Sequence, residues 1–452
     1  MTDHPGLKRS LGLWAIVALG LGYMTPTVMF DTFGIVTDET HGAVPLAYLV
    51  ALVVMLFTAI SYGRLVRVFP SAGSAYTYTR ETIHPVLGFL VGWTAMLDYL
   101  LLPLVNALII RLYMTSLFPD SPGWIWVVLI VAVITGLNAW SINSTSNVNF
   151  ALVGFAMVMI VVFVVLALGQ LADGVGQGTV LTSQPLFHPG VHAPAILTGA
   201  TVVCFSFIGF DAISMYTEEA KDRSDVPKAI VLTLLIGGAV FLAGSQVAQS
   251  VFPDTSRFSL VDDPLPEMAF LVGGRLFQIL FVSAAFAATV ASGLSSHASV
   301  SRLLHVMGRN RVLPQRVFGY VHPTRRTPVY AVVFVGLVSL LAITPSLELV
   351  SSMINFGALT AFSFVNICVI ALFAVRRREV RTARQVTTNL VLPLIGFGLT
   401  GLLWSHLHRD ALVTGLTWTA IGIAYAVVLR ITSGTRLSDF ELDLSDNLME
   451  VN

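Results

Sequence analysis

Long apolar stretches recur along the whole chain, and short polar segments that hold most of the charged residues separate them. The stretches are about 20 residues long, which is the length a helix needs to cross a hydrocarbon core of roughly 30 Å. This pattern predicts twelve membrane-spanning helices, at about 11–37, 45–68, 86–117, 122–140, 148–171, 195–217, 228–252, 268–305, 328–344, 347–375, 387–406 and 411–431. No small-residue cleavage site ends the first stretch, so we interpret it as a retained span and not as a signal peptide.

Composition and charge agree with a multi-pass membrane protein. Of the 452 residues, 55% are hydrophobic and only 11% are charged, and the mean hydropathy is +0.81. A cytoplasmic N-terminus places 21 of the 25 lysines and arginines inside, so the positive-inside rule predicts that the termini at 1–10 and 432–452 are both cytoplasmic. We therefore expect a multi-pass membrane protein. Both cysteines lie within spans, which gives no sign of a disulfide framework.

Two of the predicted spans contain residues that interrupt helices. In the first span, residues 20–26 read Gly-Leu-Gly-Tyr-Met-Thr-Pro, and the proline removes a helical hydrogen bond near mid-depth. In the sixth span, residues 207–211 read Phe-Ile-Gly-Phe-Asp, with a glycine at a comparable depth. A simple kink is the alternative for either break alone. Breaks at corresponding positions indicate a binding site between two inverted repeats, at 11–171 and 195–375, followed by two additional helices at 387–431.

Three aspartates, Asp31, Asp98 and Asp211, lie inside apolar spans, and no lysine lies in the interior of any span, since Lys228 only begins one. A charged residue at the centre of a bilayer costs about 2.5–3.5 kcal/mol on insertion scales, so it marks a functional site by default. Carboxylates without a neighbouring lysine suit a cationic ligand or a coupling cation.

Several sequence blocks resemble a known family. Residues 69–78 read Phe-Pro-Ser-Ala-Gly-Ser-Ala-Tyr-Thr-Tyr, which resembles the cytoplasmic signature of the amino acid–polyamine–organocation superfamily. Further blocks resemble the bacterial putrescine importers, at residues 30–36, 97–100, 204–212, 291–304 and 318–323, and the likeness covers roughly residues 7–430. The resemblance implies an all-α fold of five plus five helices with two more appended. It also implies a secondary transporter of the bacterial inner membrane that imports a small organic amine, putrescine first, by symport with a cation and alternating access.

One departure from the superfamily favours an amine over an amino acid. Many amino acid carriers place a Gly-Ser/Ala-Gly triplet in the first break, where its amides bind the substrate carboxylate. Residues 26–28 here are Pro-Thr-Val, and proline has no amide proton to donate. An amino acid permease or a diamine/amino acid exchanger remains the alternative. A channel or receptor is a further alternative, although the extramembrane segments are too short for a receptor's output domain.

The substrate-binding candidates follow from the two breaks, the buried acids and the resemblance. By resemblance, Asp98 and Tyr99 face the central cavity, and aromatic side chains nearby would pack a methylene chain and attract an ammonium group. For Asp98, the alternative to substrate binding is a structural role. Asp31 could instead line an extracellular vestibule. The full candidate set is Tyr23, Met24, Thr25, Pro26, Asp31, Asp98, Tyr99, Phe205, Ser206, Phe207 and Asp211.

Coupling has two candidate locations. Asp211 follows the sixth-span break and is expected to contact the substrate or to carry a proton. Ser292, Ser295 and Ser296 lie where sodium-coupled carriers of this fold bind Na+, although small serines also serve helix packing. We expect the proton, with sodium as the alternative.

The sequence contains no catalytic constellation, nucleotide loop or zinc spacing, so we expect neither an enzyme nor a cofactor. The expected partners are a small amine and the lipid bilayer, with no nucleic acid. Nothing in the sequence indicates an oligomeric state.

Overall fold

The computed structural model describes residues 11–70, 74–140, 145–179, 182–217, 220–261, 263–309, 313–322 and 327–433, and helices make up nearly all of its regular structure. Eleven helices within these ranges are long and apolar enough to cross a membrane. The span expected at 328–344 is a shorter apolar helix, Val329–Ile343. The termini expected to be cytoplasmic, 1–10 and most of 432–452, lie outside the described residues.

In chain order the elements are α1 (Leu13–Met24), α2 (Val28–Asp31), α3 (Phe33–Thr40), α4 (Val44–Val68), α5 (Ser74–Thr82), α6 (Pro85–Leu117), α7 (Gly123–Trp140), α8 (Thr145–Ala172), α9 (Ala193–Phe207), η1 (Ala212–Tyr216), α10 (Asp225–Val251), α11 (Leu265–Arg309), α12 (Gln315–Phe318), α13 (Val329–Ser339), η2 (Leu340–Ile343), α14 (Leu347–Val369), η3 (Ile370–Arg376), α15 (Ala383–Val386), η4 (Thr387–Val391), α16 (Leu392–Trp404) and α17 (Arg409–Ser433).

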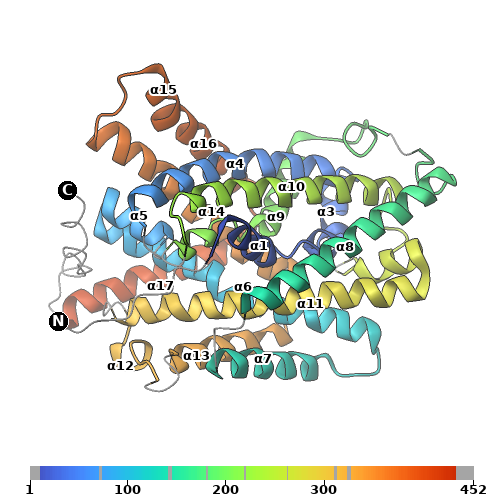
Figure 1. Ribbon diagram of the computed structural model, residues 1–452, viewed down its shortest axis with the longest axis horizontal. Helices are drawn as coiled ribbons and strands as arrows, with labels where there is room; N and C mark the ends of the chain where they lie inside the picture. Colours follow the sequence, from blue (N-terminus) through green and yellow to red (C-terminus); the bar gives the residue numbers. More distant parts are fainter. Residues whose placement is uncertain are drawn as a thin grey trace.

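The long helices form a bundle around the interrupted ones. Helix α10 packs along α4, while α6 packs against both α11 and α14. The interrupted helices α1 and α9 lie in the middle of the bundle, and α5, α12 and α15 lie at one end of it (Figure 1). Helix α8 carries exposed apolar side chains such as Val158, Val161 and Val165. A helix that is apolar on its exposed face as well as its buried one is suited to lipid, which agrees with a membrane-spanning bundle.

Both predicted helix breaks are confirmed. Helix α1 ends at Met24, and Thr25 has a left-handed backbone with φ 49° before the chain resumes as α2. Helix α9 ends at Phe207, and Gly209 has φ 130° ahead of η1. A Cβ on Gly209 would lie only 3.0 Å from the backbone nitrogen of Met24. The two breaks therefore touch, and glycine is required at Gly209 both for its φ and for the close approach.

Candidate cation-binding site

Asp98 and Asp211 come together at the centre of the bundle. Asp98 lies on α6 and Asp211 follows the break after α9, and both are 2% exposed. Asp211 accepts hydrogen bonds from the Tyr99 hydroxyl at 3.2 Å and from the backbone N–H of Gly209 at 3.2 Å. The charges of the two aspartates are close enough to act on each other. Two buried carboxylates that repel each other are most readily stabilised by positive charge placed between them.

Two polar atoms in this cluster have no hydrogen-bond partner among the described residues: Oδ1 of Asp98 and the hydroxyl of Tyr23. Tyr23 lies at the break in α1 and within electrostatic range of both aspartates. Buried polar groups are nearly always paired in native proteins, so unpaired ones at one location indicate a place for a ligand. We define Tyr23, Asp98, Tyr99 and Asp211 as the central cluster.

No positive side chain among the described residues is seen to neutralise the central cluster. The only cation well inside the third span is Arg111, and it is used elsewhere. Its guanidinium donates to the carbonyl of Ile343 and to that of Pro345 at 3.2 Å. The charge of the central cluster is thus left for a ligand to balance.

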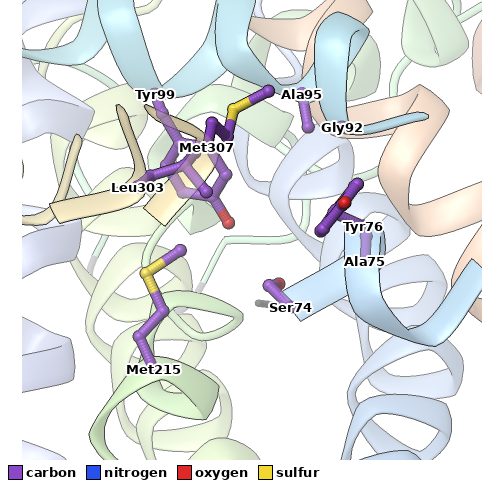
Figure 2. Close-up of a pocket in the computed structure, with 9 residues that line it drawn as sticks. All are labelled: Ser74, Ala75, Tyr76, Gly92, Ala95, Tyr99, Met215, Leu303 and Met307. Atoms are coloured by element: carbon purple, nitrogen blue, oxygen red, sulfur yellow. The ribbon is translucent and has the colours of Figure 1, made fainter. Parts of the chain in front are cut away.

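A pocket approaches the central cluster from the end of the bundle that contains α5. Figure 2 shows Tyr99 beside Met307, with its hydroxyl directed toward the space between Met215 and Ser74. Because this hydroxyl is bonded to Asp211, Tyr99 belongs both to the pocket lining and to the central cluster. The lining residues are Ser74, Ala75, Tyr76, Gly92, Ala95, Tyr99, Met215, Leu303 and Met307.

Phe207, the last residue of α9, lies in a group of tightly packed aromatic rings. Phe207 contacts Tyr48 with ring centroids 6.1 Å apart and Phe241 at 5.4 Å. The hydroxyl of Ser206 is 3.0 Å from that of Tyr48, and Phe205 is buried nearby in the chain at 5% exposure. The predicted residues 205–207 are therefore all buried, and Phe207 packs against α4 and α10.

Asp31 lies in a different location from the other two acids. Its Oδ1 accepts a hydrogen bond of 2.6 Å from the hydroxyl of Tyr113. The preceding Phe30 packs against Phe163 and Phe281, with centroids 4.7 and 5.1 Å away. The three acids predicted from the apolar spans thus form one pair and one separate residue.

The remaining predicted residues line the break in α1 or pack on it. Met24, Thr25 and Pro26 are all buried. Ser292 on α11 donates to the carbonyl of Tyr23 at 3.2 Å, a carbonyl near the end of α1. Ser296 donates to Gly293 within its own helix at 3.2 Å, and Ser295 is 6% exposed. Of the three serines, Ser292 is the one for which the structure gives a contact with the break.

Sequence reasoning missed the residues that α5 and η1 bring to the pocket, among them Ser74, Tyr76 and Met215. Ser74 and Tyr76 belong to the 69–78 signature, which was used as a family signal and not as part of the site. Tyr76 is largely buried, and this burial raises the pKa of its hydroxyl. Residues 71–73 of the signature lie outside the described part of the chain.

Comparison with known proteins gives the family. The family model described as "Amino acid permease" matches residues 11–433. The chain belongs to the amino acid permease family. Members of this family are transporters, so the protein is a multi-pass membrane transporter and not an enzyme.

Individual relatives agree with this assignment. The low-affinity putrescine importer PlaP of Escherichia coli (strain K12) is 44% identical over 425 residues, which are 94% of each chain. The branched-chain amino acid permease BcaP of Bacillus subtilis (strain 168) is 26% identical and covers 93% of each chain. Cationic amino acid transporter 4, vacuolar, of Arabidopsis thaliana is 30% identical over 81% of this chain and 63% of its own.

Proposed function

We propose that the protein imports a small organic diamine, putrescine first, by symport with a proton. The observation that carries this proposal is the pair of buried carboxylates, Asp98 and Asp211, which no described cation neutralises. The ammonium groups of a diamine would supply two positive charges to two negative ones. The likeness to a putrescine importer at 44% identity supports the same substrate.

The central cluster also suits the rest of a diamine. The hydroxyls of Tyr23 and Tyr99 would hydrogen-bond an ammonium group, and their rings would attract it by cation–π interaction. The break in α1 offers carbonyl groups, while Pro26 contributes no N–H. A substrate carboxylate would therefore lose the backbone donors that an amino acid needs, and it would lie close to Asp98 and Asp211, which repel it.

We propose that transport proceeds by alternating access in a five-plus-five inverted repeat. The contact between Gly209 and Met24 joins the two breaks, so the half-helices α2–α3 and η1 would move about one centre. We propose that the pocket on the α5 side lies on the path between the central cluster and the cytoplasm. The positive-inside distribution supports α5 as the cytoplasmic end.

Uptake in proteoliposomes tests this function. Purified protein is reconstituted, and uptake of radiolabelled putrescine is measured against competing amines and amino acids. Ornithine is the sharpest competitor, because it carries a carboxylate on the same diamine skeleton. We expect putrescine to compete at least about tenfold better than ornithine, which is a difference of 1.4 kcal/mol. Stronger competition by ornithine or a neutral amino acid would contradict the amine assignment and favour an amino acid permease or exchanger.

A further inference from the structure

The carboxyl group of Asp31 is buried and only half satisfied. The residue is 1% exposed, and Oδ2 has no hydrogen-bond partner in the described part of the chain. The other oxygen, Oδ1, is held by Tyr113 at 2.6 Å. A charge buried in this way is costly unless a cation joins it, so the group needs either a ligand or a proton during the transport cycle.

Among the described residues, the Tyr113 hydroxyl is the group that hydrogen-bonds the Asp31 carboxylate. The residue before Asp31, Phe30, packs edge-on against Phe163 and Phe281, which are apolar and offer no ligand to a metal ion. A Na+ or Ca2+ ion would need several oxygen ligands in place of its water shell. A proton needs only one carboxylate oxygen, and Oδ2 provides it.

Titratable groups on three neighbouring segments act on Asp31 or on its partner Tyr113. Tyr113 lies on α6 and donates to it. Tyr48 on α4 lies within electrostatic range of Asp31, and Asp263, before α11, acts on Tyr113. Arg111 is committed to the carbonyls of Ile343 and Pro345. The neighbourhood is therefore acidic or neutral, which favours uptake of a positive charge.

We infer that Asp31, oriented by Tyr113, is the site at which the coupling proton binds, separate from the central cluster that binds the amine. This inference rests on the proposed function. It assigns Asp98 and Asp211 to the two ammonium groups and leaves Asp31, the remaining acid predicted from the spans, for coupling. In the sequence alone, Asp211 was the candidate for the proton; its closeness to Asp98 makes it a better partner for the amine.

The position of Asp31 suits this role. It ends the short helix α2, directly between the break in α1 and the outer half-helix α3. A movement of α2 and α3 would carry Asp31 relative to Tyr113 on α6 and so change its access to water. The proton would add to Oδ2 from water on the proposed extracellular side, neutralise the carboxylate, and leave to water on the cytoplasmic side.

The test compares net uptake with exchange in Asp31→Asn. An inside-alkaline pH gradient drives accumulation of putrescine, whereas counterflow into vesicles preloaded with putrescine needs no net proton movement. We expect Asp31→Asn to lose accumulation driven by the gradient while it still catalyses counterflow. Asp98→Asn should lose both, because it removes an amine ligand. The matched control is Asp120→Asn, which changes an exposed aspartate and should retain both activities.

Several results would overturn the inference. Loss of counterflow in Asp31→Asn would make the residue an amine ligand, and undiminished accumulation would make it structural. Wild-type accumulation driven by a sodium gradient and not by a pH gradient would exclude the proton.

If purified Asp31→Asn is not monodisperse, the variant Tyr113→Phe provides the test instead. In Tyr113→Phe, the pH at which putrescine accumulation is half-maximal should rise, because the Tyr113 hydroxyl stabilises the charged carboxylate of Asp31. An unchanged pH profile would contradict the inference. Absence of putrescine uptake by the wild type would instead refute the proposed function.

Discussion

At the scale of single residues, Asp98 provides the most direct prediction. Asp98→Asn would leave one ammonium group of the bound diamine buried without its carboxylate, a change that typically costs about 3–5 kcal/mol. We therefore expect titration calorimetry on the purified variant to detect no binding of putrescine. Asp173→Asn, on an exposed aspartate, is the control and should bind like the wild type. Near-wild-type affinity in monodisperse Asp98→Asn would assign the residue a structural role.

Asp31 and Asp98 show what single residues reveal in the sequence and what they conceal. Both are acids in apolar spans, and the cost of burial correctly marked both as unusual. Their partners could not be predicted, because Tyr113 is 82 positions from Asp31 and Asp211 is brought to Tyr99 across a separation of 112. The packing of α6 against two different half-helices decides which acids form a pair, and no local sequence pattern encodes that packing.

At the scale of helices, the contact between α6 and α14 positions the site. A Cβ on Gly357 would lie 2.8 Å from the backbone nitrogen of Asp98 and 2.9 Å from the carbonyl oxygen of Thr94. Gly357→Ala must therefore push α14 away from α6, and overpacking of this kind costs about 1–3 kcal/mol. We expect both the melting temperature and the affinity for putrescine to fall. A differential scanning fluorimetry series with and without putrescine measures both effects.

The control for this prediction is Gly398→Ala on α16, where no atom lies within 4 Å of the added Cβ. Both substitutions replace glycine by alanine inside a helix, which favours the helix by roughly 1 kcal/mol in each case. The difference between the variants thus isolates the contact at Asp98. Equal melting temperatures for the two variants would show that α14 does not constrain α6 at this point.

Most of the helical architecture was predictable, because length and hydropathy largely determine a membrane span. The break at Pro26 was also predictable, since proline interrupts a helix whatever surrounds it. The contact of Gly209 with Met24 was not, because it depends on the relative placement of two half-helices. The α5 segment was likewise missed as part of the pocket, since it lies outside every apolar stretch and enters the site only through tertiary packing.

At the scale of the whole molecule, the orientation in the membrane remains a prediction from the distribution of charge. Under the proposed topology, 21 of the 25 lysines and arginines are cytoplasmic, and only Arg257, Arg275 and Arg409 are extracellular. An asymmetry of this size is characteristic of an inserted bundle with a single orientation. It also gives the face that would meet the amine few cations to repel it.

Cysteine labelling of intact cells tests this orientation. Both native cysteines, Cys204 and Cys368, are buried, so the background labelling by a membrane-impermeant maleimide should be low. We expect Asp120→Cys to be labelled from outside, and Arg316→Cys, exposed on the short helix α12, to be labelled only after the cells are lysed. Labelling of both variants in denatured protein controls for thiol reactivity. The reverse pattern would place α5 and the pocket beside Tyr99 on the extracellular side. The pocket would then be an entrance from outside, and the proton at Asp31 would be taken up from the cytoplasm.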